Sequence, residues 1–249
     1  MVCPTGWYLS SGGIKVSGKG YQISLERDEL HNYLGGYLPK GAIIYLEGPY
    51  SSGKSVLCQR FTYGLLKNLH TVTYISTELT VREFIEQMYS LDFPIASPLL
   101  SGSLLYIPVY PLIYKLKPRT DFFKKLLTAH HLYQRDVLVI DTFSSLVENS
   151  LKAKEGAFKY LSFLKRLAAL GKTIILTVDN DELANPLLLD PFKSASTVYL
   201  TLTSREIGGS ITKVIKINRY CTAENPIEDT VGFKVSPGVG IIIEITAVG

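Results

Sequence analysis

Apolar runs and helix-patterned segments alternate along the first three-quarters of the chain. The apolar runs are as short as buried strands, and between them apolar residues recur three and four positions apart, as on one face of a helix. The pattern predicts strands over residues 42–47, 72–76, 104–108, 137–140 and 173–178. It predicts helices over residues 25–34, 55–67, 121–131 and 155–170, and a further helix that begins at Thr80 with Glu83 as its capping-box partner. Strands that alternate with helices are typical of an α/β fold with a mostly parallel central sheet flanked by helices.

After residue 196 the helical pattern stops and short strands follow one another. The predicted strands of this part are 197–202, 213–218, 233–235 and 240–245. Consecutive short strands with short turns predict a C-terminal antiparallel β extension. No linker separates the two parts, which predicts a single domain over residues 1–249. Residues 1–21 are expected to be a flexible or peripheral segment, because Ser10–Gly20 is rich in glycine and serine.

Composition bounds the class of protein without identifying its function. Apolar residues make up 46% of the chain and charged residues 19%, which excludes a disordered protein. The net charge of +4 is too small to indicate a nucleic-acid binder. The three cysteines lie far apart and fit neither a disulfide framework nor a zinc site, so we expect a reducing cytoplasm. The uncharged stretch 93–114 is long enough for a bilayer, but its four prolines favour a loop followed by a buried strand.

Candidate chemistry is concentrated where the first predicted core strand ends. Gly48–Ser55 matches the phosphate-loop pattern G-x-x-x-x-G-K-[ST], with a strand before it and a helix after it. That context directs backbone N–H groups and a helix N-terminus at one polyphosphate, whereas an accidental Gly/Ser turn would lack it. Lys54 is expected to neutralise the β- and γ-phosphates, and Ser55 to bind Mg²⁺. The predicted nucleotide-binding residues are Gly48, Pro49, Tyr50, Ser51, Ser52, Gly53, Lys54, Ser55, Val56 and Asp141.

Two acidic residues follow predicted strands beside this loop. The apolar run 137–140 leads into Asp141, which we expect to hold the Mg²⁺ shell through water; the alternative is a strand-end aspartate in a turn. Residue 142 is threonine, so an acid beside Asp141 that would polarise the attacking water is missing. Glu78 is therefore the predicted catalytic base, orienting water on the γ-phosphate. The alternative for Glu78 is an acid that stabilises the N-terminus of the following helix.

Two further patterns narrow the interpretation. The letters Gly-Lys-Thr recur at residues 171–173, but there they follow a helix and enter a strand, which excludes a second phosphate loop. No Asn-Lys-x-Asp motif for reading guanine occurs, so the sequence favours an adenine nucleotide.

With these residues in view, the chain resembles the RecA/KaiC-type ATPases. Their Gly-Gly-x-x-Pro-x-Gly lead-in to the first core strand is matched by residues 35–41. The segments 76–78, 139–142 and 214–219 then follow in the expected order, and the resemblance spans residues 22–246. Within this superfamily the chain is most similar to the ATP-binding accessory proteins of the archaellum, the archaeal flagellum, over residues 53–60, 72–80 and 84–88.

The resemblance implies a KaiC-like domain that binds ATP and Mg²⁺ and forms a homo-hexameric ring. It implies docking to the archaellum motor ATPase FlaI and other motor components, in the cytoplasm at the membrane-associated base of the archaellum, without membrane insertion and without nucleic acid. It also implies weak or absent hydrolysis, so that nucleotide binding controls assembly. The chain departs from KaiC-type ATPases at Glu78-Leu79, where those proteins usually carry two adjacent glutamates.

In ring-forming relatives a late strand supplies cations to the γ-phosphate that the neighbouring subunit holds. Lys216 matches the first such position, and Asn218 stands where a second basic residue is common. Arg219 is adjacent, but strand alternation places it on the other face. The resemblance thus implies trans-acting roles for these three residues, against the alternative of ordinary solvated charges on an edge strand.

Two other functions share this fold. The first is a DNA-dependent recombinase ATPase, but the loop from Asp179 to Asn185 and the nearby Asp190 carry four acids, which would repel DNA. The second is a KaiC-like autokinase, which would use Lys54, Mg²⁺ and Glu78 with a protein hydroxyl as the acceptor. Serines and threonines are too numerous for the sequence to single out that acceptor.

Overall fold

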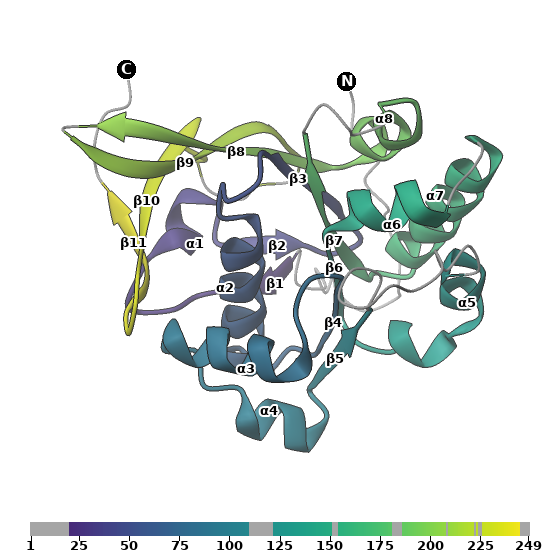
Figure 1. The fold of residues 1–249 in the computed structure, drawn as a ribbon, viewed down its shortest axis with the longest axis horizontal. Coiled ribbons are helices and arrows are strands. Elements are labelled where there is room, and N and C mark those ends of the chain that lie inside the picture. The colour runs from purple at the N-terminus through teal and green to yellow at the C-terminus, as the bar shows by residue number, and fades with distance from the viewer. Residues whose placement is uncertain are drawn as a thin grey trace, which may run out of the picture.

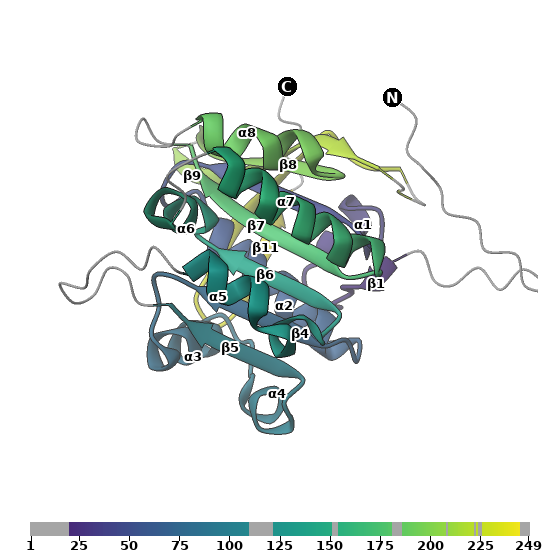
Figure 2. The same ribbon diagram turned by 90° about the vertical axis from the view of Figure 1, so that its right-hand side faces the viewer.

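A nine-stranded sheet forms the centre of the molecule, and helices cover both of its faces (Figures 1 and 2). The computed structural model describes residues 20–109, 122–150, 154–180, 186–207, 209–221, 223 and 226–244. The order of the strands is β11-β10-β9-β8-β3-β7-β6-β4-β5. The predicted α/β fold, with a mostly parallel central sheet and antiparallel C-terminal strands, is confirmed.

The parallel part of the sheet brings several strand ends to one edge. Its strands are β3 (Ile43–Gly48), β4 (Val72–Ser76), β5 (Leu104–Pro108), β6 (Val137–Asp141) and β7 (Thr173–Asp179). Gly48 lies in register with Asp179, and Ser76 lies in register with Asp141. The carboxyl ends of β3, β7, β6 and β4 therefore meet, at the edge where open α/β sheets bind ligands.

The strand β8 (Val198–Ile207) joins the parallel and antiparallel parts. It pairs in parallel with β3 and antiparallel with β9 (Ser210–Tyr220), so the strand predicted at 197–202 belongs to both parts. β10 (Thr230–Ser236) and β11 (Gly240–Glu244) complete the extension. A separate sheet of β1 (Gly20–Gln22) and β2 (Tyr37–Pro39) has no counterpart in the sequence pattern, because three-residue strands are too short to show alternation.

Side chains alternate between the two faces of β3 and so contribute to two cores. Ile44 and Leu46 belong to the core that includes buried side chains of α2 (Lys54–Lys67) and α3 (Val81–Ser90). Ile43 and Tyr45 belong to the core on the other face, with α6, α7 and α8. The remaining helices are α1 (Leu30–Tyr33), α4 (Ala96–Ser101), α5 (Phe122–Thr128), α6 (Phe143–Ser150), α7 (Lys154–Ala169), α8 (Pro186–Ala195) and a 3₁₀ helix (His130–Tyr133).

The capping box predicted at Thr80 is present. The Thr80 hydroxyl accepts the N–H of Glu83, and the Glu83 carboxylate accepts the N–H of Thr80. By contrast, the helix predicted over 25–34 is too long, because only α1 is helical there. The Asp28 carboxylate before α1 accepts hydrogen bonds from Arg60 and from the Leu30 N–H. The helix predicted over 121–131 is α5, followed by the 3₁₀ helix.

Three helices are not predicted by the sequence pattern. α4 lies in the stretch interpreted as a loop, and α6 follows Asp141 almost directly. α8 carries Pro191 in its interior, which hides the helical signal of its buried Leu188, Leu189 and Phe192.

Some predictions fall outside the described residues, namely those for 1–19, 110–114, 181–185 and Ile245. We expected four acids in a loop after β7 that would repel DNA, and for two of them this expectation is wrong. Asp190 lies in α8, and Asp179 forms an ion pair with Lys54. Within the described ranges, no helix has both the length and the apolar character that crossing a bilayer needs.

Candidate functional site

The predicted phosphate loop connects the end of β3 to the start of α2 (Figure 1). Two of its residues adopt left-handed backbone conformations, with φ of 61° at Ser51 and 100° at Gly53. A Cβ atom at Gly48 would lie 2.4 Å from the carbonyl oxygen of Leu202, so that position requires glycine. The N-terminus of α2, a helix of 14 residues, opens at this loop and favours an anion there.

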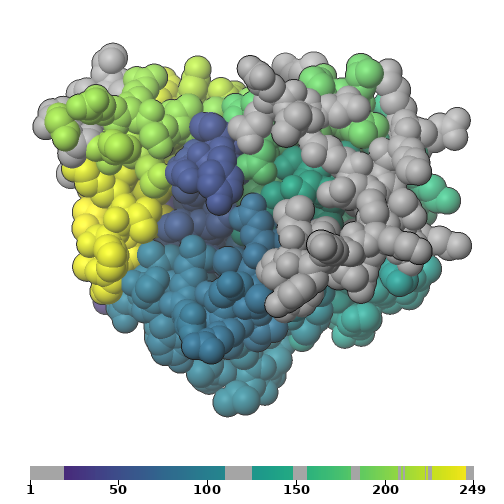
Figure 3. Space-filling model, in the orientation of Figure 1, coloured from purple at the N-terminus to yellow at the C-terminus, as the bar shows by residue number. Residues whose placement is uncertain are grey.

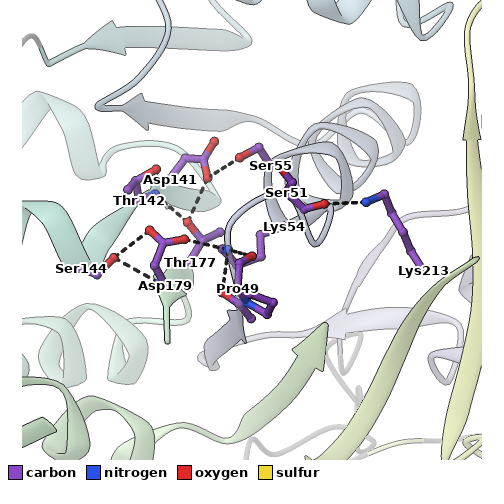
Figure 4. A network of polar contacts seen from close by, with 11 residues as sticks. Pro49, Ser51, Lys54, Ser55, Asp141, Thr142, Ser144, Thr177, Asp179 and Lys213 are labelled. Atoms are coloured by element: carbon purple, nitrogen blue, oxygen red, sulfur yellow. Dashed lines mark hydrogen bonds and ion pairs between the residues drawn. The ribbon is translucent and has the colours of Figure 1, made fainter. Parts of the chain in front are cut away.

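Lys54 places its ammonium at the mouth of the loop (Figure 4). Its Nζ donates hydrogen bonds of 2.8 Å to the carbonyl oxygens of Gly48 and Pro49, and lies 2.8 Å from Asp179 Oδ1. Asp179 is in turn oriented by Ser144, whose hydroxyl lies 3.2 Å from Asp179 Oδ2. The carboxylate and the two carbonyl oxygens thus hold the Lys54 ammonium at the loop. There it can attract a phosphate with only a small movement of its side chain.

Asp141 is surrounded by hydroxyl groups. Ser55 donates a hydrogen bond of 3.1 Å to Asp141 Oδ1, Thr177 donates one of 2.9 Å to the same oxygen, and Tyr74 donates one of 2.8 Å to Oδ2. Burial raises the pKa of the Asp141 carboxyl, and the hydrogen bonds from these hydroxyls oppose that rise. A serine hydroxyl beside a carboxylate gives the hard oxygen donors that Mg²⁺ prefers, so Ser55 and Asp141 fit the predicted metal.

Glu78 lies near Asp141 and is tied to Thr142. Burial and the negative charge of Asp141 raise the pKa of Glu78, while a hydrogen bond with the Thr142 side chain opposes the rise. Thr142 has a φ of 61°, a strained conformation for a β-branched residue, and its N–H donates a bond of 2.6 Å to the Thr177 hydroxyl. The threonine that replaces an acid after Asp141 therefore helps to hold the acid supplied by another strand.

These groups surround a cavity of about 330 Å³, large enough for part of a nucleotide. On the face shown in Figure 3, the blue surface near residue 50 lies between the yellow-green C-terminal strands and the surface of α3. The lining residues are Tyr50, Ser51, Gly53, Lys54, Ser55, Val56, Glu78, Gln87, Thr142, Asp179, Lys213 and Val235. The structure thus brings the predicted phosphate loop and the predicted base to one cavity, and Asp141 is hydrogen-bonded to Ser55, one of its lining residues.

The predicted trans-acting residues lie on β9 and are not among the residues that line the cavity. Lys216 and Asn218 are exposed, and the Asn218 amide donates a bond of 2.7 Å to the Thr201 hydroxyl. The prediction that alternation places Arg219 on the other face is wrong, because a β-bulge at Asn218 interrupts the alternation. Lys216 lies in register with Thr201 and Arg219 with Tyr199, so both face the same side of the sheet. Arg219 is half-buried there and donates hydrogen bonds to the Lys193 carbonyl oxygen at 2.6 Å and the Ser196 hydroxyl at 2.9 Å. Lys216 and Asn218 are accessible to a neighbour, whereas Arg219 is engaged with α8 of its own chain.

Sequence reasoning missed several groups at this site. Asp179 ends the apolar strand β7 as Asp141 ends β6, and that shared pattern could have identified it. Lys213, Thr177 and Tyr74 reach the site through long-range contacts and carry no local signal.

Comparison with known proteins gives consistent matches. The family model described as "ATPase: KaiC" matches residues 27–246. Archaeal flagellar ATP-binding protein FlaH of Methanocaldococcus jannaschii is 41% identical over 91% of this chain and 97% of its own length. Its counterpart from Methanococcus voltae is 39% identical over 91% of this chain and 98% of its own length.

Comparison with solved structures leads to the same family. The crystal structure of flagellar accessory protein FlaH from M. jannaschii matches with a TM-score of 0.85 and 40% identity, over 91% of this chain and all of that chain. A KaiC-like protein from Pyrococcus horikoshii has a TM-score of 0.69 at 17% identity, over 87% of this chain and 95% of its own, and shows the shared fold alone. The similarity to RecA/KaiC-type ATPases and to archaellum accessory proteins is confirmed.

Proposed function

This chain belongs to the KaiC family of ATPases, as one of its archaeal flagellar FlaH proteins, and from that premise we propose that it is an ATP-binding regulatory subunit of the archaellum motor. The observation that carries this proposal is the position of the Lys54 ammonium, bound to the loop carbonyls and Asp179 at the mouth of the cavity. Titration of the protein with ATP in excess Mg²⁺, monitored by calorimetry, tests it. Saturable binding is expected, and its absence would contradict the proposal.

Each part of the loop has a role in holding the nucleotide. Lys54 exchanges its carbonyl contacts for the β- and γ-phosphate oxygens, while backbone N–H groups and the start of α2 bind the same anion. Ser55 and Asp141, which are hydrogen-bonded to each other, would hold Mg²⁺, Asp141 through water. Mg²⁺, when bound, neutralises charge on the phosphates. Tyr50 and Val56 line the same cavity and would contact the rest of the nucleotide.

Hydrolysis is proposed to be weak and to depend on Glu78. Glu78 orients water as a base only while its carboxyl is ionised. Because its pKa is raised, we expect hydrolysis to decline as the pH falls, starting at a higher pH than for an exposed glutamate.

The variant Glu78→Gln tests this role. We expect single-turnover ATP hydrolysis to fall by roughly 100-fold, on the scale of a lost general base, with ATP affinity nearly unchanged. Glu86→Gln is the control, because Glu86 is an exposed acid of α3 that pairs with Arg82. An original hydrolysis rate in Glu78→Gln would remove the catalytic role.

We further propose that nucleotide binding controls assembly into a homo-hexameric ring and docking to FlaI. The exposure of Lys216 and Asn218 on one face of β9 supports a contact with the neighbour's γ-phosphate. Capture of FlaI in ATP but not in ADP would support the docking step, whereas equal capture in both would contradict nucleotide control.

The variant Lys216→Ala tests the contact between subunits. ATP-dependent assembly, followed by light scattering during size-exclusion chromatography, is expected to need about tenfold more protein, because one charge-assisted hydrogen bond per interface is lost. Lys159→Ala removes an exposed lysine of α7 and should assemble normally. Unaltered assembly of Lys216→Ala would exclude the trans-acting role.

A further inference from the structure

A lysine of the same chain binds the phosphate loop from its outer side. Lys213 on β9 donates a hydrogen bond of 2.5 Å from Nζ to the carbonyl oxygen of Ser51. Figure 4 shows Lys213 reaching Ser51 from the side opposite to Asp141 and Asp179. We propose that Lys213 is a positioning residue that clamps the loop in the shape that receives a polyphosphate, an inference that rests on the proposed ATP site.

The backbone of Lys213 is well placed for such a clamp. It lies in register with Ser204 of β8 and Phe233 of β10, so strands hold it on both sides. Its aliphatic stem packs against the loop, since a Cβ atom at Gly53 would lie 3.0 Å from Lys213 Cδ and 3.3 Å from Phe233 Cζ. The glycine at position 53 is therefore required both by its left-handed φ and by the close approach of Lys213.

The clamp acts on a peptide group that matters for phosphate binding. A planar trans peptide directs its C=O and N–H in opposite directions, so holding the Ser51 oxygen outward directs the Ser52 N–H into the loop. That N–H now donates a long bond of 3.2 Å to the Pro49 carbonyl oxygen. Ser51 has a left-handed φ that is uncommon for a residue with a side chain, and the bond from Lys213 offsets that strain.

The charge of Lys213 fits an anion site. Lys213 is half-buried and lines the same cavity as Lys54. Burial and the positive charge of Lys54 lower the pKa of Lys213, which means that the two ammonium groups repel each other. A polyphosphate in the cavity offsets that repulsion, because its negative charge would lie between the two ammonium groups.

The variant Lys213→Met tests the clamp, because methionine keeps an unbranched stem on Gly53 and removes the ammonium. Hydrogen exchange of the nucleotide-free protein is expected to accelerate in peptides spanning residues 48–57 and not in β11. ATP affinity in excess Mg²⁺ is expected to fall about tenfold, on the scale of one charge-assisted hydrogen bond. The control is Lys234→Met, which removes a lysine of β10 that pairs with Glu244.

Two results would overturn the proposal: original exchange rates at 48–57 in Lys213→Met, or an original ATP affinity. Exchange is measured without nucleotide, so it decides the clamp even if the unsubstituted protein fails to bind ATP. That failure would remove the proposed function instead, and the two outcomes are distinguishable. Acceleration throughout the chain would also overturn the proposal, because it would show a general loss of stability.

Discussion

Replacing Lys54 by alanine is expected to lower the affinity for ATP in excess Mg²⁺ by at least about 100-fold, the scale of truncating one partner of a buried charge pair. The reason is the charge left in the cavity. Asp179 loses the ammonium that lies 2.8 Å away, and with Asp141 and Glu78 nearby the phosphates would face three acids. Lys213 still lines the cavity, but its ammonium is bound to the Ser51 carbonyl oxygen and does not replace that of Lys54 beside Asp179.

Calorimetry or a fluorescent ATP analogue measures this loss, and the chain offers a close control. Lys172 stands in the same Gly-Lys-Thr letters, but its Nζ donates to the Gln134 carbonyl oxygen at 2.8 Å, between α7 and β7. Lys172→Ala should bind ATP normally. If Lys54→Ala bound ATP as tightly as the original chain while remaining folded, the assignment of the phosphate loop would be wrong.

Replacing Arg60 by methionine is expected to lower the free energy of unfolding by about 3–5 kcal/mol, as breaking a buried ion pair does. The Arg60 and Asp28 side chains are 0% and 1% exposed. Arg60 Nε donates to Asp28 Oδ2 at 2.9 Å, and its Nη1 donates to the Ile23 carbonyl oxygen at 2.5 Å. Without the guanidinium, a carboxylate and a carbonyl oxygen stay buried without these donors.

Urea denaturation measures this effect, and two further variants show its cause. The double variant Arg60→Met/Asp28→Leu should recover part of the loss, because it removes both buried charges together. Arg82→Met breaks an exposed pair with Glu86 on α3 and should change stability little. An Arg60→Met protein as stable as the original would show that this pair does not anchor the segment before α1 to α2.

Much of the fold could be predicted because its signals are local. The strands β4 and β5 have the predicted bounds, and the capping box opens α3 as expected. The missed helix α8 shows the limit of this approach. Its buried leucines and Phe192 are spaced for a helix, but two prolines within ten residues obscure the pattern, and only packing against the sheet makes the helix favourable.

The phosphate loop could be identified from the chain alone, because consecutive residues between a strand and a helix specify it, and Asp141 could be placed at the end of an apolar strand. Which distant groups meet at this loop depends on the folded chain: Asp179 pairs with Lys54, Thr142 bonds to Glu78, and Lys213 bonds to Ser51. The physical reason is that periodicity along the chain encodes which face of an element is buried. The order and register of strands, which bring β9 to the phosphate loop, arise from the packing of the whole sheet.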